Sequence, residues 1–146
     1  MALELSHEVL IGASVEDTFR ACDSREQQLA WVGSLIEVRI ESEEEWGEGS
    51  RFVQIHEEAG SRQALEGVIL GYEPGERIHM KLEHPDFSLE SVLRFEDQGG
   101  LTRVSQQTLL ELRSAKLKFV ASMVEGVVAR RISEDLERLK ALLESA

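Results

Sequence analysis

The stretch from Leu117 to Leu143, LKFVASMVEGVVARRISEDLERLKALL, decides which fold the rest of the chain can adopt. Its apolar residues recur every three or four positions, which is the spacing of one face of an α-helix. They are Leu117, Val120, Val124, Val128, Ile132, Leu136, Leu139 and Leu143. This spacing predicts one amphipathic helix of roughly seven turns.

The two halves of this predicted helix differ in the width of their apolar face. Phe119, Met123 and Val127 widen the face, but only in the first half. The second half is narrow and carries opposite charges four residues apart, which stabilise a helix by a few tenths of a kcal/mol per pair. These pairs are Arg130–Glu134, Arg131–Asp135 and Glu134–Arg138. We therefore expect the first half to cover a broad apolar surface and the second half to dock along a narrow seam.

The chain before this helix alternates apolar and polar residues with period two, which predicts β-strands. The alternating segments are 3–11, 36–41, 51–58, 63–72, 78–83, 87–95 and 101–112. Two short helices interrupt them after the first strand. Ser14 is a good N-cap for the first, and Asp23-Ser-Arg-Glu26 resembles a capping box for the second, with Ser24 and Gln27 as the alternative register. The second helix is expected to run to about Ser34. An antiparallel meander has one apolar face that another element must cover. The C-terminal helix is the one element long enough to do so.

The stretch 43–52, EEEWGEGSRF, raises the possibility of a phosphate-binding loop, because it contains Gly47 and Gly49 before Ser50. Such a loop needs a helix N-terminus and a lysine after the glycines, whereas an alternating strand follows here. The glycines therefore predict a hairpin turn. Trp46 beside the turn lies either at the rim of a cavity or as a cap on the outer face of the sheet, and we favour the second position.

The acidic run around this turn has two interpretations, a cation-binding site and a solvent-exposed hairpin. It consists of Glu41, Glu43, Glu44, Glu45 and Glu48. A calcium loop needs ligands at defined spacing around a sharp turn, and the run lacks that spacing. A solvated hairpin is the favoured interpretation.

Composition limits the classes of function. The chain has 146 residues, enough for a single domain over 1–146, and a net charge of −12. That charge argues against nucleic acid and against an anionic membrane surface, both of which attract basic patches. Cys22 is the only cysteine, and no signal-peptide pattern or membrane-length apolar run occurs. We expect a cytoplasmic protein without membrane insertion, as a monomer or a homodimer.

Several short motifs together carry a resemblance to a known superfamily. They are Ile11-Gly-Ala-Ser-Val-Glu-Asp-Thr-Phe19, Trp31, Gly47-Glu-Gly49-Ser-Arg-Phe52, Gly67-Val-Ile-Leu-Gly-Tyr-Glu-Pro74, Gly99-Gly-Leu-Thr-Arg-Val104 and the C-terminal helix. In this order and spacing, the chain resembles the START-like, or birch-pollen-allergen-like, helix-grip superfamily, in its polyketide cyclase/dehydrase-like branch. The family often has proline shortly after the tryptophan. Val32 and Gly33 stand there in this chain, which leaves open how that loop borders a cavity.

The resemblance implies an α+β helix-grip fold. In it, a curved antiparallel sheet of about seven strands carries two short helices after the first strand, and the long C-terminal helix packs across the sheet. It also implies a cavity between sheet and helix that binds an apolar or amphipathic small molecule, as in a carrier or sensor. Gly67 and Gly71 share a strand face, and their missing side chains are expected to leave room.

Two alternative functions stay open. One is a cofactor-independent cyclase, aromatase or dehydrase that uses the same cavity, and the other is a protein-interaction module like the chaperone-activator relatives. The residues that we expect to line the cavity combine apolar and polar side chains, with no metal and no cofactor. They are His7, Trp31, Leu65, Ile69, Met80, Leu89, Ser91, Leu93, Gln106, Thr108, Phe119, Met123 and Val127.

The histidines are the first candidates for chemistry, and none of the four stands in a metal motif. His7 interrupts an apolar strand face, where it either hydrogen-bonds a core partner or faces the cavity. Gln54 or His56 is a further polar candidate for the inner face, whereas Arg51 and Arg94 alternate outward unless the register slips by one residue. Because no acid–base pair is evident, an enzyme is the minority interpretation.

Overall fold

A computed structural model describes residues 1–42 and 45–145 of the chain, so Glu43 and Glu44 of the acidic run lie outside the described residues. The strands are β1 (Ala2–Ile11), β2 (Leu35–Ile40), β3 (Arg51–Glu58), β4 (Ser61–Glu73), β5 (Arg77–His84), β6 (Phe87–Gln98) and β7 (Leu101–Leu112). The helices are α1 (Val15–Asp23), α2 (Arg25–Trp31), α3 (Ala115–Phe119) and α4 (Ala121–Glu144).

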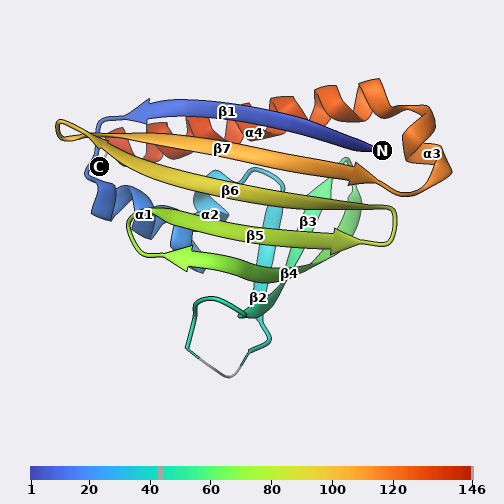
Figure 1. Cartoon of the computed structure of the whole chain (residues 1–146), viewed down its shortest axis with the longest axis horizontal. Helices are drawn as coiled ribbons and strands as arrows, with labels where there is room; N and C mark the ends of the chain where they lie inside the picture. The colour runs from blue at the N-terminus through green and yellow to red at the C-terminus, as the bar shows by residue number, and fades with distance from the viewer. Residues whose placement is uncertain (43–44, 146) are drawn as a thin grey trace.

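The sheet confirms the predicted helix-grip architecture. Its seven strands follow the order β1-β7-β6-β5-β4-β3-β2, and every neighbouring pair is antiparallel. The strands after β2 therefore form a meander, and β7 then pairs with β1. Helix α4 lies along the sheet on the side of β1, while α1 and α2 lie beneath one end of the strands (Figure 1).

The first short helix begins where Ser14 predicts, and the second begins in the alternative register, at Ser24. The Ser14 hydroxyl accepts a hydrogen bond from the Asp17 amide at 3.1 Å, and the Ser24 hydroxyl accepts one from the Gln27 amide at 3.3 Å. Helix α2 ends at Trp31, earlier than the expected Ser34. The reason is tertiary: Val32 is extended, and the Gly33 amide donates to the Asp135 carboxylate of α4 at 3.0 Å.

The expectation of one continuous C-terminal helix is wrong. Val120 leaves the helical conformation, with φ −109° and ψ 29°, and separates the short α3 from α4. No residue of α3 is buried. The buried residues of α4 are Ile132, at its midpoint, and Leu136 and Leu139, in its second half. This helix therefore docks by its second half, as the narrow stripe predicted.

Two other expectations need correction. The alternation of 36–41 predicts Ile36 on the same apolar face as Val38. A bulge between Leu35 and Glu37 instead turns Leu35 into the core and leaves Ile36 42% exposed. Gly67 does not open a cavity either. The ring of Phe52 on β3 occupies the space in front of it, and a Cβ at Gly67 would collide with that ring.

The glycines between β2 and β3 form a turn, as predicted. Gly49 has a φ of +89°, and its amide donates to the Ile69 carbonyl at 2.8 Å. Trp46 does not cap the outer face. Its ring packs against Phe52 with a centroid distance of 5.6 Å, and its indole N–H donates to the Asp23 carboxylate at 2.9 Å. This is a correction of the position that we favoured.

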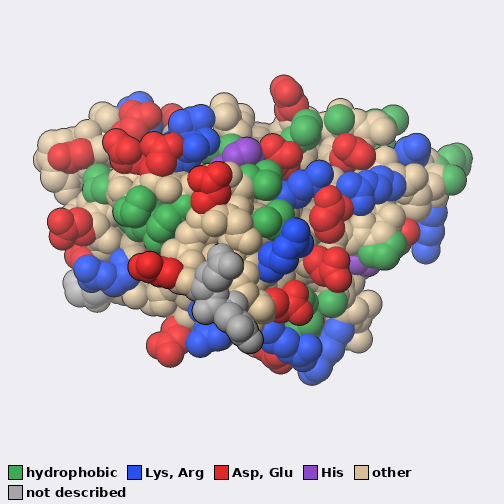
Figure 2. Space-filling view, turned by 60° about the horizontal axis from the view of Figure 1, so that its bottom comes forward, with side chains coloured by type: hydrophobic (Ala, Val, Ile, Leu, Met, Phe, Trp, Pro, Cys, Tyr) green, Lys and Arg blue, Asp and Glu red, His purple; other side chains and the backbone are tan. Residues whose placement is uncertain are grey.

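The surface carries charges of both signs. On the face in Figure 2, acidic and basic side chains are interspersed, and apolar side chains are scattered among them. Within the described residues, no helix is both long and apolar enough to cross a membrane.

Candidate functional site

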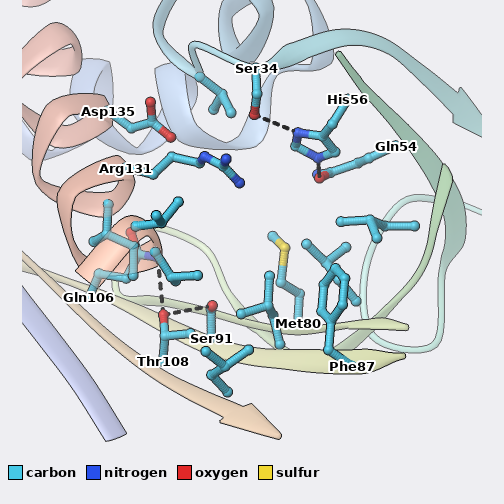
Figure 3. Close-up of a pocket in the computed structure, with 18 of the residues that line it drawn as sticks. Ser34, Gln54, His56, Met80, Phe87, Ser91, Gln106, Thr108, Arg131 and Asp135 are labelled. Carbon is cyan, nitrogen blue, oxygen red and sulfur yellow. Dashed lines mark hydrogen bonds between the residues drawn. The ribbon is translucent and has the colours of Figure 1, made fainter. Parts of the chain in front are cut away.

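A cavity of about 370 Å³ lies between the sheet and α4 (Figure 3). Its apolar wall comes from β4, β5, β6, α3 and the first half of α4. The main apolar side chains of this wall are Leu65, Met80, Leu82, Phe87, Leu89, Leu93, Leu117, Met123, Val124, Val127 and Val128. Met123 lines the cavity and is also 63% exposed, so the cavity reaches the surface beside the junction of α3 and α4.

The cavity exists because α4 is held to the sheet at one end only. Leu136 and Leu139 are fully buried, and α4 packs along β1 and α2. On the part of α4 nearer Val120, the side chains of Met123, Val124 and Val127 line the same cavity as strand residues such as Met80 and Leu89, which are only half-buried. Apart from the exposed Phe119, the wide apolar face predicted for residues 117–128 thus faces a hollow rather than a filled core.

The first polar cluster of the cavity joins Ser34, His56 and Gln54. The Nε2 of His56 lies 2.9 Å from the amide oxygen of Gln54, an acceptor, so Nε2 carries the proton. The Nδ1 of His56 then accepts a hydrogen bond from the Ser34 hydroxyl, at 2.8 Å. Both ring nitrogens of the neutral imidazole are therefore satisfied.

His56 is neutral for physical reasons as well. Burial, and then the positive charge of Arg131, lower the pKa of its imidazole from 6.5 to about 4. A general base works best with a pKa near the working pH. With a pKa near 4, His56 is too weak a base to activate the Ser34 hydroxyl near neutral pH, so the cluster is better suited to recognition than to nucleophilic catalysis.

Arg131 extends from α4 into the cavity, toward the His56 cluster (Figure 3). Its ion-pair partner within the described residues is Glu58, at the end of β3, and not the expected Asp135. Asp135 instead accepts a hydrogen bond from Arg138 at 2.7 Å and one from the Gly33 amide. The expected Arg130–Glu134 pair is present at 3.9 Å.

Asp135 links the loop that holds Ser34 to α4. Its side chain is 13% exposed, and burial, despite its two hydrogen-bond donors, raises the pKa of its carboxyl above the ordinary value. By fixing the Gly33 amide, it places Ser34 opposite His56. Asp135 therefore positions the first polar cluster from the helix side.

A second polar cluster lies on the opposite wall, on β6 and β7. The hydroxyls of Ser91 and Thr108 lie 2.9 Å apart, and the Gln106 side-chain amide donates to the Thr108 hydroxyl at 3.2 Å. Apolar residues such as Met80 separate this group from the His56 cluster (Figure 3). The cavity thus presents two polar positions within an apolar wall.

The thiol of Cys22 is not suited to nucleophilic chemistry. Cys22 borders the cavity, but burial and then the charge of Asp23 raise the pKa of its thiol far above the ordinary value, so the reactive thiolate does not form. In the described ranges, no group of His, Cys, Asp and Glu side chains is arranged to hold a metal ion.

Most of the expected site residues border the cavity. They are Trp31, Leu65, Met80, Leu89, Ser91, Leu93, Gln106, Thr108, Met123 and Val127. His7, Ile69 and Phe119 lie outside its lining. His7 is on β1, the strand against which α4 packs, and its buried Nε2 has no hydrogen-bond partner within the described residues. Ile69 is packed in the core, and Phe119 is 91% exposed on α3.

The list of expected site residues left out Arg131 and Asp135, the charged groups of the cavity lining, although Gln54 or His56 was named as an inner-face candidate. Gln54 and His56 follow Phe52 at period two, so the alternation of β3 already placed them on the inner face. Arg131 and Asp135 are one helical turn apart, and their opposite charges were explained by pairing with each other. Their positions beside the apolar Val128 and Ile132 were the available signal that they border the cavity.

Known structures share this architecture over the full length of the chain. Ara h 8.0201 superposes with a TM-score of 0.79 at 11% identity, covering 100% of both chains. TTHA0849 from Thermus thermophilus gives 0.78 at 18% identity, with 98% of each chain covered. The di-domain ARO/CYC StfQ from the steffimycin biosynthetic pathway gives 0.83 at 12% identity, covering 99% of this chain and 51% of that chain.

At these identities, the structural likeness establishes the fold alone. Among curated proteins, no sequence matches this chain significantly. The family described as "Polyketide cyclase / dehydrase and lipid transport" matches residues 2–144, nearly the whole chain. The chain therefore belongs to this polyketide cyclase / dehydrase and lipid transport family.

Proposed function

We propose that the chain binds an apolar or amphipathic small molecule in the cavity between the sheet and α4, as a carrier or sensor. The observation that carries this proposal is the cavity itself. It has about 370 Å³ and a mostly apolar lining with two separate polar clusters. This is the size and character of sites that bind small molecules.

The test is to purify the protein and examine it intact by native mass spectrometry. A second portion is extracted with organic solvent, and the extract is analysed by ordinary mass spectrometry. The proposal predicts an apolar or amphipathic molecule bound at one per chain, or uptake of a neutral apolar probe such as phenylnaphthylamine. A protein that arrives empty and binds no such probe would contradict it.

Met123→Trp tests where the ligand enters. Met123 lies at the exposed mouth, so an indole there should obstruct the opening and lower probe affinity by roughly tenfold or more, while circular dichroism stays unchanged. Phe119→Trp is the matched control, because Phe119 is 91% exposed and does not line the cavity. Equal probe binding by wild type and Met123→Trp would remove Met123 from the proposed route.

A second candidate function is a cyclase-like or dehydrase-like activity in the same cavity. Two convergent hydroxyls, Ser91 and Thr108, and the Ser34–His56 pair favour it, since such groups can orient the carbonyls of a poly-carbonyl chain. The low pKa of His56 weighs against it, because the best-placed base is weak near neutral pH. Liquid chromatography with mass spectrometry separates the two functions. A carrier returns an added linear poly-carbonyl chain unchanged, a cyclase returns an isomer of equal mass with a different retention time, and a dehydrase returns a product lighter by one water.

A further inference from the structure

Arg131 is a cation that borders an otherwise mostly apolar cavity. It projects from α4, its side chain is 35% exposed, and its guanidinium lies toward the Ser34–His56–Gln54 cluster (Figure 3). A cation at the edge of an apolar cavity has a higher affinity for an anion than the same cation in open water, because the surroundings screen its charge less. The described part of the chain supplies one ion-pair partner, Glu58.

The Glu58 partner is replaceable. Its side chain is 57% exposed, and an ion pair between exposed groups contributes little stability because water and salt screen it. A guanidinium has five N–H donors in a planar fork, so it can bind a second anion or exchange one carboxylate for another. Binding of a ligand anion at Arg131 therefore displaces only a weak contact.

Apart from Glu58, the described groups near Arg131 form no ion pair with its guanidinium. His56 is neutral, and its two nitrogens are bonded to Ser34 and Gln54. The carboxylate of Asp135 accepts its hydrogen bonds from the Gly33 amide and Arg138, and it interacts with Arg131 through their charges without forming an ion pair with it. An anion beside Arg131 thus meets a cationic donor whose one described ion pair, with Glu58, is exposed to solvent, and polar neighbours with the apolar wall directly adjoining.

We propose that Arg131 binds an anionic group of the ligand, such as a carboxylate or an enolate, beside the Ser34–His56–Gln54 cluster. The ligand is then an amphipathic organic anion whose apolar body lies along Met80 and Phe87. Its far end reaches the hydroxyls of Ser91 and Thr108, which favours a carbonyl or hydroxyl group there. This inference rests on the proposed function, since it specifies the ligand of the same cavity.

The test uses two fluorescent probes that differ in charge. Anilinonaphthalene sulfonate is permanently anionic, whereas phenylnaphthylamine has the same aromatic body without the sulfonate. Arg131→Gln should lower the affinity for the sulfonate probe by roughly tenfold or more, as expected for loss of a charge-assisted hydrogen bond. It should leave the affinity for the neutral probe within about twofold of wild type. Glu58→Gln should raise the affinity for the sulfonate probe, because it removes the competing carboxylate.

Arg130→Gln is the matched control, because Arg130 is the adjacent arginine of α4, is 70% exposed and does not line the main cavity. It should leave both affinities unchanged, and circular dichroism checks that all variants fold. If both probes bind wild type but Arg131→Gln weakens neither, or both equally, the anion site is refuted while the cavity function stands. If neither probe binds wild type, the proposed function itself fails.

Discussion

His56 is the residue whose charge reports most directly on the cavity. It faces Arg131 from α4, with Asp135 one helical turn further along α4 and Glu58 two positions along its own strand. Burial first, and the Arg131 charge second, lower its pKa from 6.5 to about 4. Because the folded value lies below the unfolded one, acid protonates the unfolded chain first. His56 therefore removes stability as the pH falls from 6.5 toward 4 and has no effect at higher pH.

This electrostatic account predicts a measurable titration. In wild type, the imidazole of His56 should keep the neutral Nε2–H form down to about pH 4. Arg131→Gln should raise the pKa of His56, because the second cause of its depression is gone, and bound anilinonaphthalene sulfonate should raise it too. Nitrogen-detected NMR of the histidine rings measures both. An unchanged His56 pKa in Arg131→Gln would show that burial alone lowers it.

At the scale of elements, the two ends of the C-terminal helical region differ in function. The second half of α4 docks on the rest of the fold through the fully buried Leu136 and Leu139, whereas α3 and the first half of α4 border the cavity. A leucine in each region gives a matched comparison. Leu136→Ala should lower the free energy of unfolding by about 2–5 kcal/mol, as buried leucines do.

Leu117→Ala should cost less than about 1 kcal/mol, because Leu117 on α3 is half-buried and already borders a hollow rather than close-packed atoms. Urea denaturation monitored by circular dichroism measures both changes. Similar losses of stability in the two variants would mean that α3 is packed as firmly as the second half of α4, and that the two regions do not differ in function.

The elements themselves were largely predictable, because each depends on local signals. Ser14 and Ser24 cap their helices, period-two alternation marks seven strands, and the stripe at Ile132, Leu136 and Leu139 marks the seam. The break at Val120 was not predictable, since Val120 continues the helical spacing without interruption. Nothing in residues 115–124 marks where a helix that spans a hollow will bend.

The site was predictable only where side-chain direction follows from period. Ser91 and Thr108 were expected because strand alternation turns them inward, and they are directly paired across β6 and β7. Arg131 and Ser34 were missed, because their roles depend on how α4 and the loop after α2 meet β3 in space. The expectation that Gly67 leaves room for a cavity was wrong for the same reason, since the ring of the neighbouring Phe52 fills the space beside it.

At the scale of the whole molecule, the hollow between sheet and helix couples ligand binding to stability. A ligand that binds only the folded chain stabilises it by about 2.7 kcal/mol at one hundred times its dissociation constant. Saturating phenylnaphthylamine should therefore raise the urea midpoint of wild type, and Met123→Trp should show a much smaller shift at the same concentration. The slope of the urea transition should stay constant, because the probe changes the population of the folded state rather than the surface exposed on unfolding. If the probe fluoresces with wild type yet leaves the midpoint unmoved, it binds folded and unfolded chains alike, and the fluorescence would report surface adsorption instead of occupation of the cavity.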